Sequence, residues 1–378
     1  MENILVMFGG ESTEHDISII SALQAIENLD KSKYNIMPFY IDKNGNFLAG
    51  EKLKELGFLK NIDYKKVKNV YFKPNSNFLY AKGKFKEIKL FKVDVALPIF
   101  HGKNGEDGVV QGLLKLSKIP FASCDILGCS VGMDKIVQKH IYKSLDIPVL
   151  EHFWFDKAEY LKNPEEILNN NEFDFPKIVK PSNLGSSIGI NIANNKQELK
   201  NAIDIALNFD KKIIVERALT NFKEINIALL KQDDEILFSD IEQPRNWKRF
   251  LDFDEKYMSN IKTGKSSTEK QQKKVAINAK LLNDIKKFSL KVYRLLDAKG
   301  TIRFDYIYDK IDKKIYLNEI NVIPGSLSFY LWKNHNFEYK QLLDILINQA
   351  KIEDKREKEI STIYISDVLN KPVKSIKK

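Results

Sequence analysis

Short apolar runs, glycine turns and periodic helical segments alternate along the first part of the chain. Residues 4–8 are all apolar and end at Gly9-Gly10, after which apolar side chains recur at three- and four-residue spacing between Ile19 and Leu29. A wholly apolar run predicts a strand buried on both faces, and the wider spacing predicts an amphipathic helix. The same order returns at residues 93–100, which precede HGKNGEDG and a helix at about 109–117. The chain is therefore predicted to open with an α/β layer.

Two further α/β units are predicted after this layer. The second contains, in order, a helix at 133–145, a strand at 176–181, a loop rich in Gly and Ser at 182–189 and a strand at 211–216. The third contains a helix at about 268–296 and two strands at 300–308 and 314–322. These elements predict an α/β protein of three domains, at residues 1–123, 124–215 and 216–350. Residues 50–92 are predicted to be an irregular lysine-rich insertion, and residues 351–378 a charged surface appendage.

The charge of the chain invites a nucleic-acid role, because its formal net charge is +10 over 378 residues. Only six of its 61 basic residues are arginines, however, and arginine is the side chain that nucleic-acid surfaces favour. The excess is also local: residues 262–291 carry nine lysines and two acidic residues, and residues 351–378 carry eight basic and five acidic ones. We therefore expect solvated lysine surfaces and no nucleic-acid partner.

The cysteines and the apolar stretches exclude other classes. Cys124 and Cys129 are too few for a disulfide framework and lack the spacing of a zinc site, which fits a reducing compartment. The N-terminus has no basic segment before its apolar run, and no stretch approaches the roughly 18 apolar residues of a membrane span. The sequence predicts a cytoplasmic protein without a membrane partner.

The clearest candidate chemistry lies on the two strands of the third unit. Arg303 and Asp305 are two residues apart and share one strand face, and Glu319 and Asn321 do the same on the next strand. A hairpin turn at 309–313 would bring both pairs onto one surface. Two carboxylates and an amide oxygen suit magnesium that also binds phosphates. The alternative is a solvent-facing strand pair with ordinary ion pairs.

Two lysines form a second candidate group. Lys135 stands at a predicted helix start, and Lys180 lies in an apolar strand, where a lysine usually needs an anionic partner. The loop 182–189 that follows Lys180 has the composition of a phosphate-binding loop, although it lacks the GK[ST] ending of a P-loop.

A third candidate is the segment GGESTEHDIS at residues 9–18. Its ordinary interpretation is a helix start with Ser12 or Thr13 as the N-cap and acids in the first turn. The alternative is functional, with Glu14 holding a substrate ammonium group.

These motifs, in this order, resemble the D-alanine–D-alanine ligase family of the ATP-grasp superfamily. The resemblance covers roughly residues 1–345 and rests on FGGESTEHDIS, HGKNGEDGVVQG, MDK, FPKIVKPSNLGSSIGI, ERALTNFKEI, EKYMS, RFDY and NEINVIPG. It implies a Rossmann-like N-terminal domain followed by a two-part ATP-grasp module. It also implies two D-amino acids as substrates, ATP as co-substrate, two magnesium ions with manganese as an alternative, an acyl-phosphate intermediate and a homodimer.

The resemblance assigns roles by matching position. Those for ATP are Lys135, Lys180, Ser187, Glu216, Ala218, Leu219, Glu224 and Lys256, and those for metal are Asp305, Glu319 and Asn321. Arg303 and the Gly325 amide would stabilise the tetrahedral intermediate. Glu14 would bind the first amino acid, and Ser186 would link Glu14 to Tyr257 on a loop at about 245–267 that closes over the site. His101 would also contact substrate.

The sequence departs from the family pattern after Gly325. Tyr330 stands where a serine that binds the acceptor carboxylate is expected, so Ser326, Ser328 or Tyr330 itself would take that role. The resemblance as a whole implies D-alanyl-D-alanine as the product, for peptidoglycan precursors. D-serine or another amino acid as acceptor is the closest alternative, and an ATP-binding regulator without ligase activity is a further one.

Overall fold

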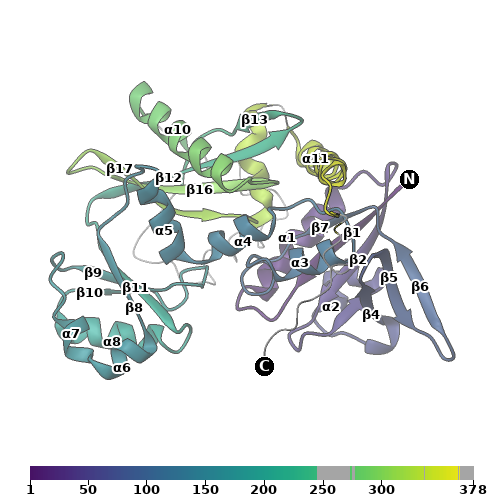
Figure 1. Cartoon of the computed structure of the whole chain (residues 1–378), viewed down its shortest axis with the longest axis horizontal. Helices are drawn as coiled ribbons and strands as arrows, with labels where there is room; N and C mark the ends of the chain where they lie inside the picture. The colour runs from purple at the N-terminus through teal and green to yellow at the C-terminus, as the bar shows by residue number, and fades with distance from the viewer. Residues whose placement is uncertain (245–272, 275–276, 336, 365, 367–378) are drawn as a thin grey trace.

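Three β-sheets lie along the chain, each with helices packed on it (Figure 1). The structure is a computed structural model and describes residues 1–244, 273–274, 277–335, 337–364 and 366. Together the sheets and helices form the mixed α/β architecture that the hydrophobic pattern predicts.

The N-terminal sheet has seven strands in the order β6-β5-β4-β3-β2-β1-β7. Their bounds are β1 Glu2–Gly9, β2 Tyr34–Ile41, β3 Phe47–Ala49, β4 Lys68–Lys73, β5 Ser76–Lys82, β6 Glu87–Lys92 and β7 Val95–Pro98. β1 pairs in parallel with β2 and β7. Residues 4–8 of β1 are fully buried, as predicted, because α1 (His15–Asn28) and α3 (Val109–Leu116) cover opposite faces of this strand.

The predicted insertion at 50–92 is more regular than expected. It contains η1 (Glu51–Lys54), α2 (Leu56–Leu59), η2 (Tyr64–Lys66) and three strands, β4 to β6, which extend the N-terminal sheet in antiparallel fashion. The lysines hid this pattern because they occupy the solvent side of strands whose other side chains, such as Val70, Leu79 and Phe91, enter the core.

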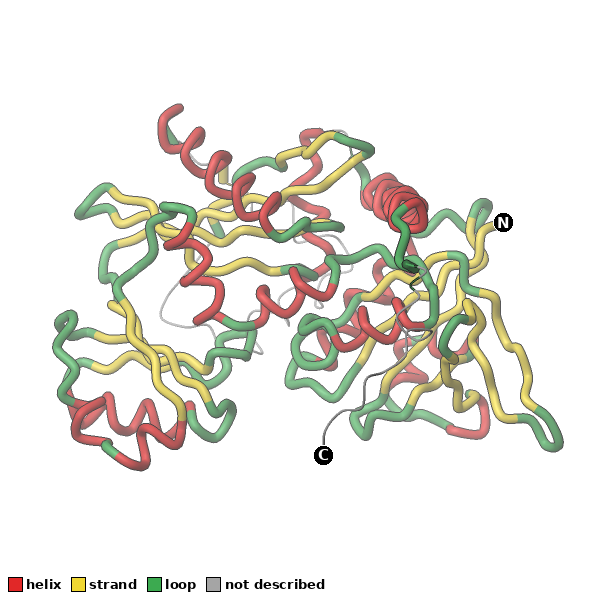
Figure 2. The backbone as a smooth tube through the Cα atoms, in the orientation of Figure 1, coloured by secondary structure: helices red, strands yellow, loops and turns green. Residues whose placement is uncertain are grey.

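The central sheet has four antiparallel strands in the order β10-β9-β11-β8. Their bounds are β8 His152–Asp156, β9 Lys177–Pro181, β10 Asn191–Ala193 and β11 Lys212–Arg217. Helices α6 (Lys157–Lys162), α7 (Pro164–Leu168) and α8 (Lys196–Ala206) gather against it (Figure 2). The predicted strands at 176–181 and 211–216 are confirmed by β9 and β11.

The C-terminal sheet has the path β15-β14-β12-β16-β17, with β13 paired to β12. Its strands are β12 Phe222–Gln232, β13 Glu235–Phe238, β14 Glu242–Gln243, β15 Lys273–Lys274, β16 Thr301–Asp309 and β17 Lys314–Asn321. Helix α10 (Ala279–Leu295) packs on it, and the hydroxyl group of Tyr306 donates to the Ile285 carbonyl at 3.2 Å. The helix predicted from residue 268 therefore begins later, since β15 occupies residues 273–274.

The helix predicted at 133–145 is confirmed, and a separate helix directly precedes it. α4 (Ile126–Met133) ends at Asp134, and α5 (Lys135–Ser144) begins there because the Asp134 side chain accepts from the backbone N–H groups of Ile136 and Val137. Both helices pack against β17 of the C-terminal sheet. Lys135 is consequently the first residue of a helix, as the sequence predicts.

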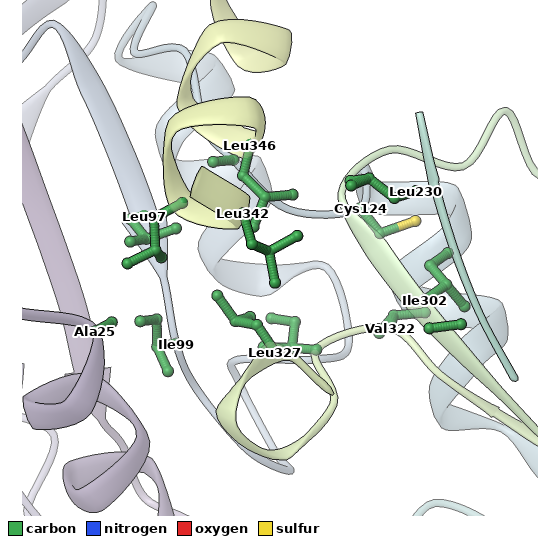
Figure 3. Packing of buried hydrophobic residues seen from close by; sticks show 14 of the residues in the cluster. Ala25, Leu97, Ile99, Cys124, Leu230, Ile302, Val322, Leu327, Leu342 and Leu346 are labelled. Atoms are coloured by element: carbon green, nitrogen blue, oxygen red, sulfur yellow. The ribbon is translucent and has the colours of Figure 1, made fainter. Parts of the chain in front are cut away.

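The C-terminal helix joins the N-terminal and C-terminal sheets. α11 (Tyr339–Glu359) and η4 (Gly325–His335) place Leu327, Leu342 and Leu346 between Leu97 and Ile99 on one side and Ile302 on the other (Figure 3). The appendage predicted from residue 351 is wrong in its first part, because residues 351–359 continue this helix. Two ion pairs fix this part of the helix. Lys231 Nζ lies 2.8 Å from Glu353 Oε1, and Lys299 Nζ lies 2.7 Å from Glu357 Oε1.

Candidate active site

The predicted hairpin brings the four polar residues onto one surface. Strands β16 and β17 are joined by a turn at 310–313, and their register places Arg303 opposite Asn321 and Asp305 opposite Glu319. Ile302, Phe304 and Ile320 on the other face are buried. The shared face is therefore confirmed, and ordinary strand alternation produces it.

Asp305 is the centre of this group. Arg303 donates to it twice, from Nε to Oδ1 at 2.7 Å and from Nη2 to Oδ2 at 2.8 Å. Asn321 Nδ2 donates to the same Oδ2 at 2.9 Å. Within the described residues no three His, Cys, Asp or Glu side chains form a metal-holding cluster. The set still fits magnesium by its chemistry, because Asp305, Glu319 and Asn321 offer oxygen atoms only, and magnesium commonly completes its shell with water and phosphate.

The lysines converge on an acidic side chain of β11, as the burial of Lys180 requires. Lys180 Nζ donates to Glu216 Oε2 at 3.0 Å, and Lys139 Nζ lies 3.3 Å from Glu216 Oε1. Burial alone would raise the pKa of Glu216, but the charges of Lys139 and Lys180 outweigh it and lower that pKa to about 2. Burial lowers the pKa of Lys139, against the attraction of Glu216.

Lys139 is a residue that sequence reasoning missed. It lies four residues after Lys135, so both side chains lie on one side of α5. The four-residue spacing of the two lysines in MDKIVQKH could have indicated that Lys139 lies near Lys135. Glu216 is consequently an internal counter-ion for two lysines, and the ATP contact that the resemblance implies for Glu216 stays a prediction.

Lys135 connects the lysines to the carboxylates. Its Nζ donates to the Leu184 carbonyl at 2.7 Å and lies 3.7 Å from Glu319 Oε2. Lys180 Nζ also reaches Asn318 Oδ1 at 3.3 Å. The loop 182–189, the start of α5 and the β16–β17 hairpin therefore meet at one place, although they come from three distant parts of the sequence.

The Ser186 hydroxyl donates to Glu14 Oε1, which joins the same loop to the N-terminal unit. A Cβ atom on Gly185 would lie 2.6 Å from Glu14 Oε2, so only glycine allows this approach. The expected N-cap is corrected: Glu14 itself precedes α1, and Ser12 Oγ accepts from the Glu14 N–H group at 3.1 Å. Ser187, with φ of 60°, lies one residue further along the loop.

Two models of the D-ala D-ala ligase family match the chain, the N-terminus at residues 3–124 and the C-terminus at residues 141–348. The D-alanine–D-alanine ligase of Thermosipho africanus is 38% identical over 369 residues, covering 95% of this chain and 96% of the relative. The chain belongs to the D-alanine–D-alanine ligase family. Its fold is that of ATP-grasp ligases.

Two solved structures of ligases are similar to this chain. The VanG D-Ala:D-Ser ligase from Enterococcus faecalis has a TM-score of 0.75 and 29% identity, and covers 92% of this chain and 99% of its own. The D-alanine–D-alanine ligase from Bacillus anthracis complexed with ATP has a TM-score of 0.66 and 25% identity, and covers 94% of this chain and 100% of its own.

The remaining ATP residues of the family pattern are only partly placed. The Ala218 N–H group donates to the Pro176 carbonyl at 3.0 Å, so this N–H is already engaged within the central unit. Leu219 follows it in the loop between β11 and β12, and Glu224 lies on β12 opposite Ile307. Lys256, Tyr257 and the predicted closing loop at 245–267 lie outside the described residues.

The segment to which the resemblance assigns the acceptor carboxylate lies in η4. Ser326, Leu327 and Ser328 all have left-handed φ angles of 49° to 53°, which turns the chain sharply after Gly325. Ser328 is fully buried, while Ser326 Oγ donates to Gln24 on α1 at 2.6 Å. Burial raises the pKa of Tyr330 to about 12. η4, which bears Tyr330, packs against β16, the strand of Arg303, and the charge of Arg303 opposes the rise in the pKa of Tyr330.

His101 and Glu106 of the HGKNGEDG motif adjoin this region. His101 Nε2 lies 3.1 Å from Ser21 Oγ, and burial lowers the pKa of His101 to about 4, with the charge of Arg303 acting in the same direction. Burial and the charge of Glu14 raise the pKa of Glu106 above its ordinary value. Sequence reasoning singled out His101 and missed Glu106.

None of the described helices is both long enough and apolar enough to span a membrane.

Proposed function

We propose that this chain is an ATP-dependent ligase that joins two D-alanine molecules, through an acyl phosphate, into D-alanyl-D-alanine for peptidoglycan precursors. The observation that carries the proposal is the approach of Lys135 Nζ to within 3.7 Å of Glu319 Oε2. Lys135, which suits phosphate, and Glu319, which suits magnesium, therefore lie together beside the loop 182–189 that contacts Glu14. Family membership supports the same chemistry.

ATP and magnesium are part of the proposal. The family is ATP-dependent, and the similar ligase from Bacillus anthracis was solved in complex with ATP. Asp305, Glu319 and Asn321 would hold magnesium, in two ions or with manganese in its place. Such a metal, when bound, offsets the negative charge of the phosphates.

The first step is phosphoryl transfer. Glu14 binds the ammonium of the first D-alanine and directs its carboxylate to the γ-phosphorus of ATP. A new oxygen–phosphorus bond forms, the bond to the bridging oxygen breaks, and ADP leaves. Lys135 and Lys180 contribute positive charge near the transferred group, which lowers the barrier to a step dominated by positioning and electrostatics.

The second step is amide formation. The amine of the second amino acid, after losing a proton, attacks the acyl carbon, and phosphate departs. Arg303 and the Gly325 amide would stabilise the oxyanion that develops. Gly325 suits this role because nothing lies within 4 Å of the position a Cβ would take, so it borders open space. We further propose that Ser328 and Tyr330 shape the pocket for the acceptor carboxylate.

A second candidate is a D-alanine–D-serine ligase. Tyr330 replaces the serine expected at that position, and a D-Ala:D-Ser ligase is among the similar structures. A catalytically silent ATP-binding regulator is less consistent with a chain that keeps Arg303, Asp305, Glu319 and Asn321 together.

An acceptor screen tests the proposal. The protein is given ATP, magnesium and D-alanine, alone or with D-serine or other amino acids, and products are identified by mass while phosphate is measured. We expect D-alanyl-D-alanine as the main product. A dominant mixed dipeptide would favour the second candidate, and no D-alanine-dependent phosphate release would refute the ligase assignment.

Three further expectations accompany the proposal. An ATP-consuming enzyme with Cys124 and Cys129 both unbridged fits the cytoplasm. We expect a homodimer, which light scattering would check. We expect no nucleic-acid binding, so random duplex should show no mobility shift even at low salt.

A further inference from the structure

Two further polar residues extend the row that contains Asp305 and Glu319. Glu242 on β14 lies directly opposite Asn226 on β12, and Asn226 lies directly opposite Asp305 on β16. Directly opposed residues of antiparallel strands point to the same face of a sheet. The side chain of Glu242 therefore stands on the face of Arg303 and Asp305, two strands from Asp305, at roughly 10 Å by the usual strand spacing.

The two glutamates at the ends of this row have different charged neighbours. Glu319 at one end lies beside Lys135, which suits phosphate. Glu242 at the other end influences Arg303, Asp305 and Tyr330: burial raises the pKa of Glu242 to about 7, with Arg303 opposing and Asp305 adding to that rise. Its charge also adds to the burial that raises the pKa of Tyr330. The register places Glu242 on the sheet face of Arg303, and η4, which bears Tyr330, packs against β12 and β16, so the three side chains lie in one region at the end of the row opposite Lys135.

A carboxylate in that position favours a cationic ligand. The reactants of the proposed ligation carry two cationic groups, the ammonium groups of the two amino acids, and the Glu14 region accounts for the first. Arg303, which lies beside the row two residues from Asp305, would contact the reacting acyl group, and Tyr330 follows the turn assigned to the acceptor carboxylate. An acceptor lying between Arg303 and Tyr330 would present its ammonium to Glu242, and its charge would compensate the burial of that carboxylate.

We propose that Glu242 binds the ammonium group of the second amino acid and so makes the site selective for amine acceptors. The proposal rests on the ligase function proposed above. Glu242 is a binding residue for one substrate only, so its loss should weaken acceptor binding and leave the use of ATP and of the first amino acid intact.

The test uses the full-length variants Glu242→Gln, Glu242→Asp and, as a matched control on the neighbouring strand, Glu235→Gln. Glu235 is exposed and lies outside the proposed site. The first half-reaction is measured by trapping the acyl phosphate with hydroxylamine, which is largely uncharged at neutral pH and needs no anionic partner. The complete reaction is measured as dipeptide formed against acceptor concentration, and again with D-lactate, which has a hydroxyl in place of the ammonium.

We expect Glu242→Gln to raise the KM for the acceptor by about 10- to 100-fold, the range for a charge-assisted hydrogen bond. Its hydroxamate formation, its KM for ATP and its D-lactate ligation should stay within about twofold of the unmodified protein. Glu242→Asp should fall between, and Glu235→Gln should match the unmodified protein.

The two proposals fail in different ways. Normal hydroxamate formation with an unchanged acceptor KM in Glu242→Gln would overturn the role of Glu242 and leave the ligase standing. Equal losses with amine and D-lactate acceptors would overturn it as well, since a merely structural role predicts them. Absence of D-alanine-dependent hydroxamate in the unmodified protein would remove the ligase function, and the role of Glu242 with it. If Glu242→Gln does not fold, the acceptor KM of Glu242→Asp decides by the same criterion.

Discussion

Arg303 donates two hydrogen bonds, of 2.7 and 2.8 Å, to Asp305, which lies two residues later on the same strand. The guanidinium thereby neutralises the carboxylate to which we assign a metal ion. Because a metal on Asp305 would compete for the same oxygens, the pair links the proposed metal site to the group that would stabilise the reacting oxyanion.

Arg303→Ala should lower the turnover of dipeptide synthesis by about a thousandfold or more, because the variant loses an oxyanion-stabilising charge. ATP binding, measured by calorimetry, should remain. Arg294→Ala, on the exposed side of α10, is the control and should retain full turnover. Near-normal turnover of Arg303→Ala would exclude this side chain from the chemistry.

Asp305→Asn should weaken manganese binding at least tenfold, since the central oxygen ligand loses its charge. Titration of the protein with manganese, followed by electron paramagnetic resonance, reports this without any need for catalysis. Asp312→Asn, in the exposed turn of the same hairpin, should bind manganese normally. Equal affinities for the two variants would contradict the assignment of Asp305.

Glu216→Gln should lower the free energy of unfolding by about 3 kcal/mol near pH 7, because it leaves Lys139 and Lys180 buried without a counter-ion. The native pKa of Glu216 is lowered to about 2. Its ionised form therefore stabilises the fold above the ordinary carboxyl range, and this contribution is lost as pH falls from about 4.3 towards 2. Denaturant unfolding across that range should show the gap between the two proteins closing, and a constant gap would argue against the ion cluster.

Gly185→Ala should raise the KM for the first D-alanine, because the new Cβ would lie 2.6 Å from Glu14 Oε2 and displace that carboxylate. Gly185 does not have a positive φ, so backbone strain does not explain such an effect. Gly57→Ala, where nothing lies within 4 Å of a Cβ, is the matched control. Saturation curves for D-alanine in the hydroxylamine assay measure both, and coincident curves would place Glu14 outside the donor site.

Glu353→Gln should destabilise the protein by about 1–2 kcal/mol, since Glu353 accepts hydrogen bonds from Lys231 and Gln349 while largely buried. Glu359→Gln, in the exposed last turn of α11, should leave the melting temperature unchanged. Thermal unfolding followed by circular dichroism separates them. Identical melting temperatures would mean that residues 351–359 add nothing to stability, as the appendage interpretation implied.

Local rules carried much of the sequence prediction. Apolar runs placed β1, β7, β9 and β11, because a strand buried on both faces carries a charge only where that charge has a partner, as Lys180 and Glu216 do. Alternation placed Arg303 with Asp305, and Glu319 with Asn321, on one face before any partner strand was known. The same rule applied to KEINIALL would have aligned Asn226 with Glu224, a signal that went unused.

Errors arose where composition hid the pattern. The lysines of residues 50–92 concealed three strands, and those of residues 351–359 concealed the end of a helix. In both segments charged side chains alternate with residues that pack or form ion pairs, and charge alone does not separate a solvated loop from the outer face of a regular element.

By itself the sequence determined which side chains share a strand face, which lysines need an anion and which glycines precede helices, because these follow from backbone periodicity and burial costs within a few residues. Only the tertiary structure decided that Glu216 serves Lys180 and Lys139 together, that Lys135 reaches Glu319, and that Glu242 and Asn226 continue the row of Asp305. Those relations depend on strand order and on the packing of three sheets, which join separate segments of the chain, 184 residues apart in the case of Lys135 and Glu319. Local periodicity carries no information about which distant strand becomes the neighbour.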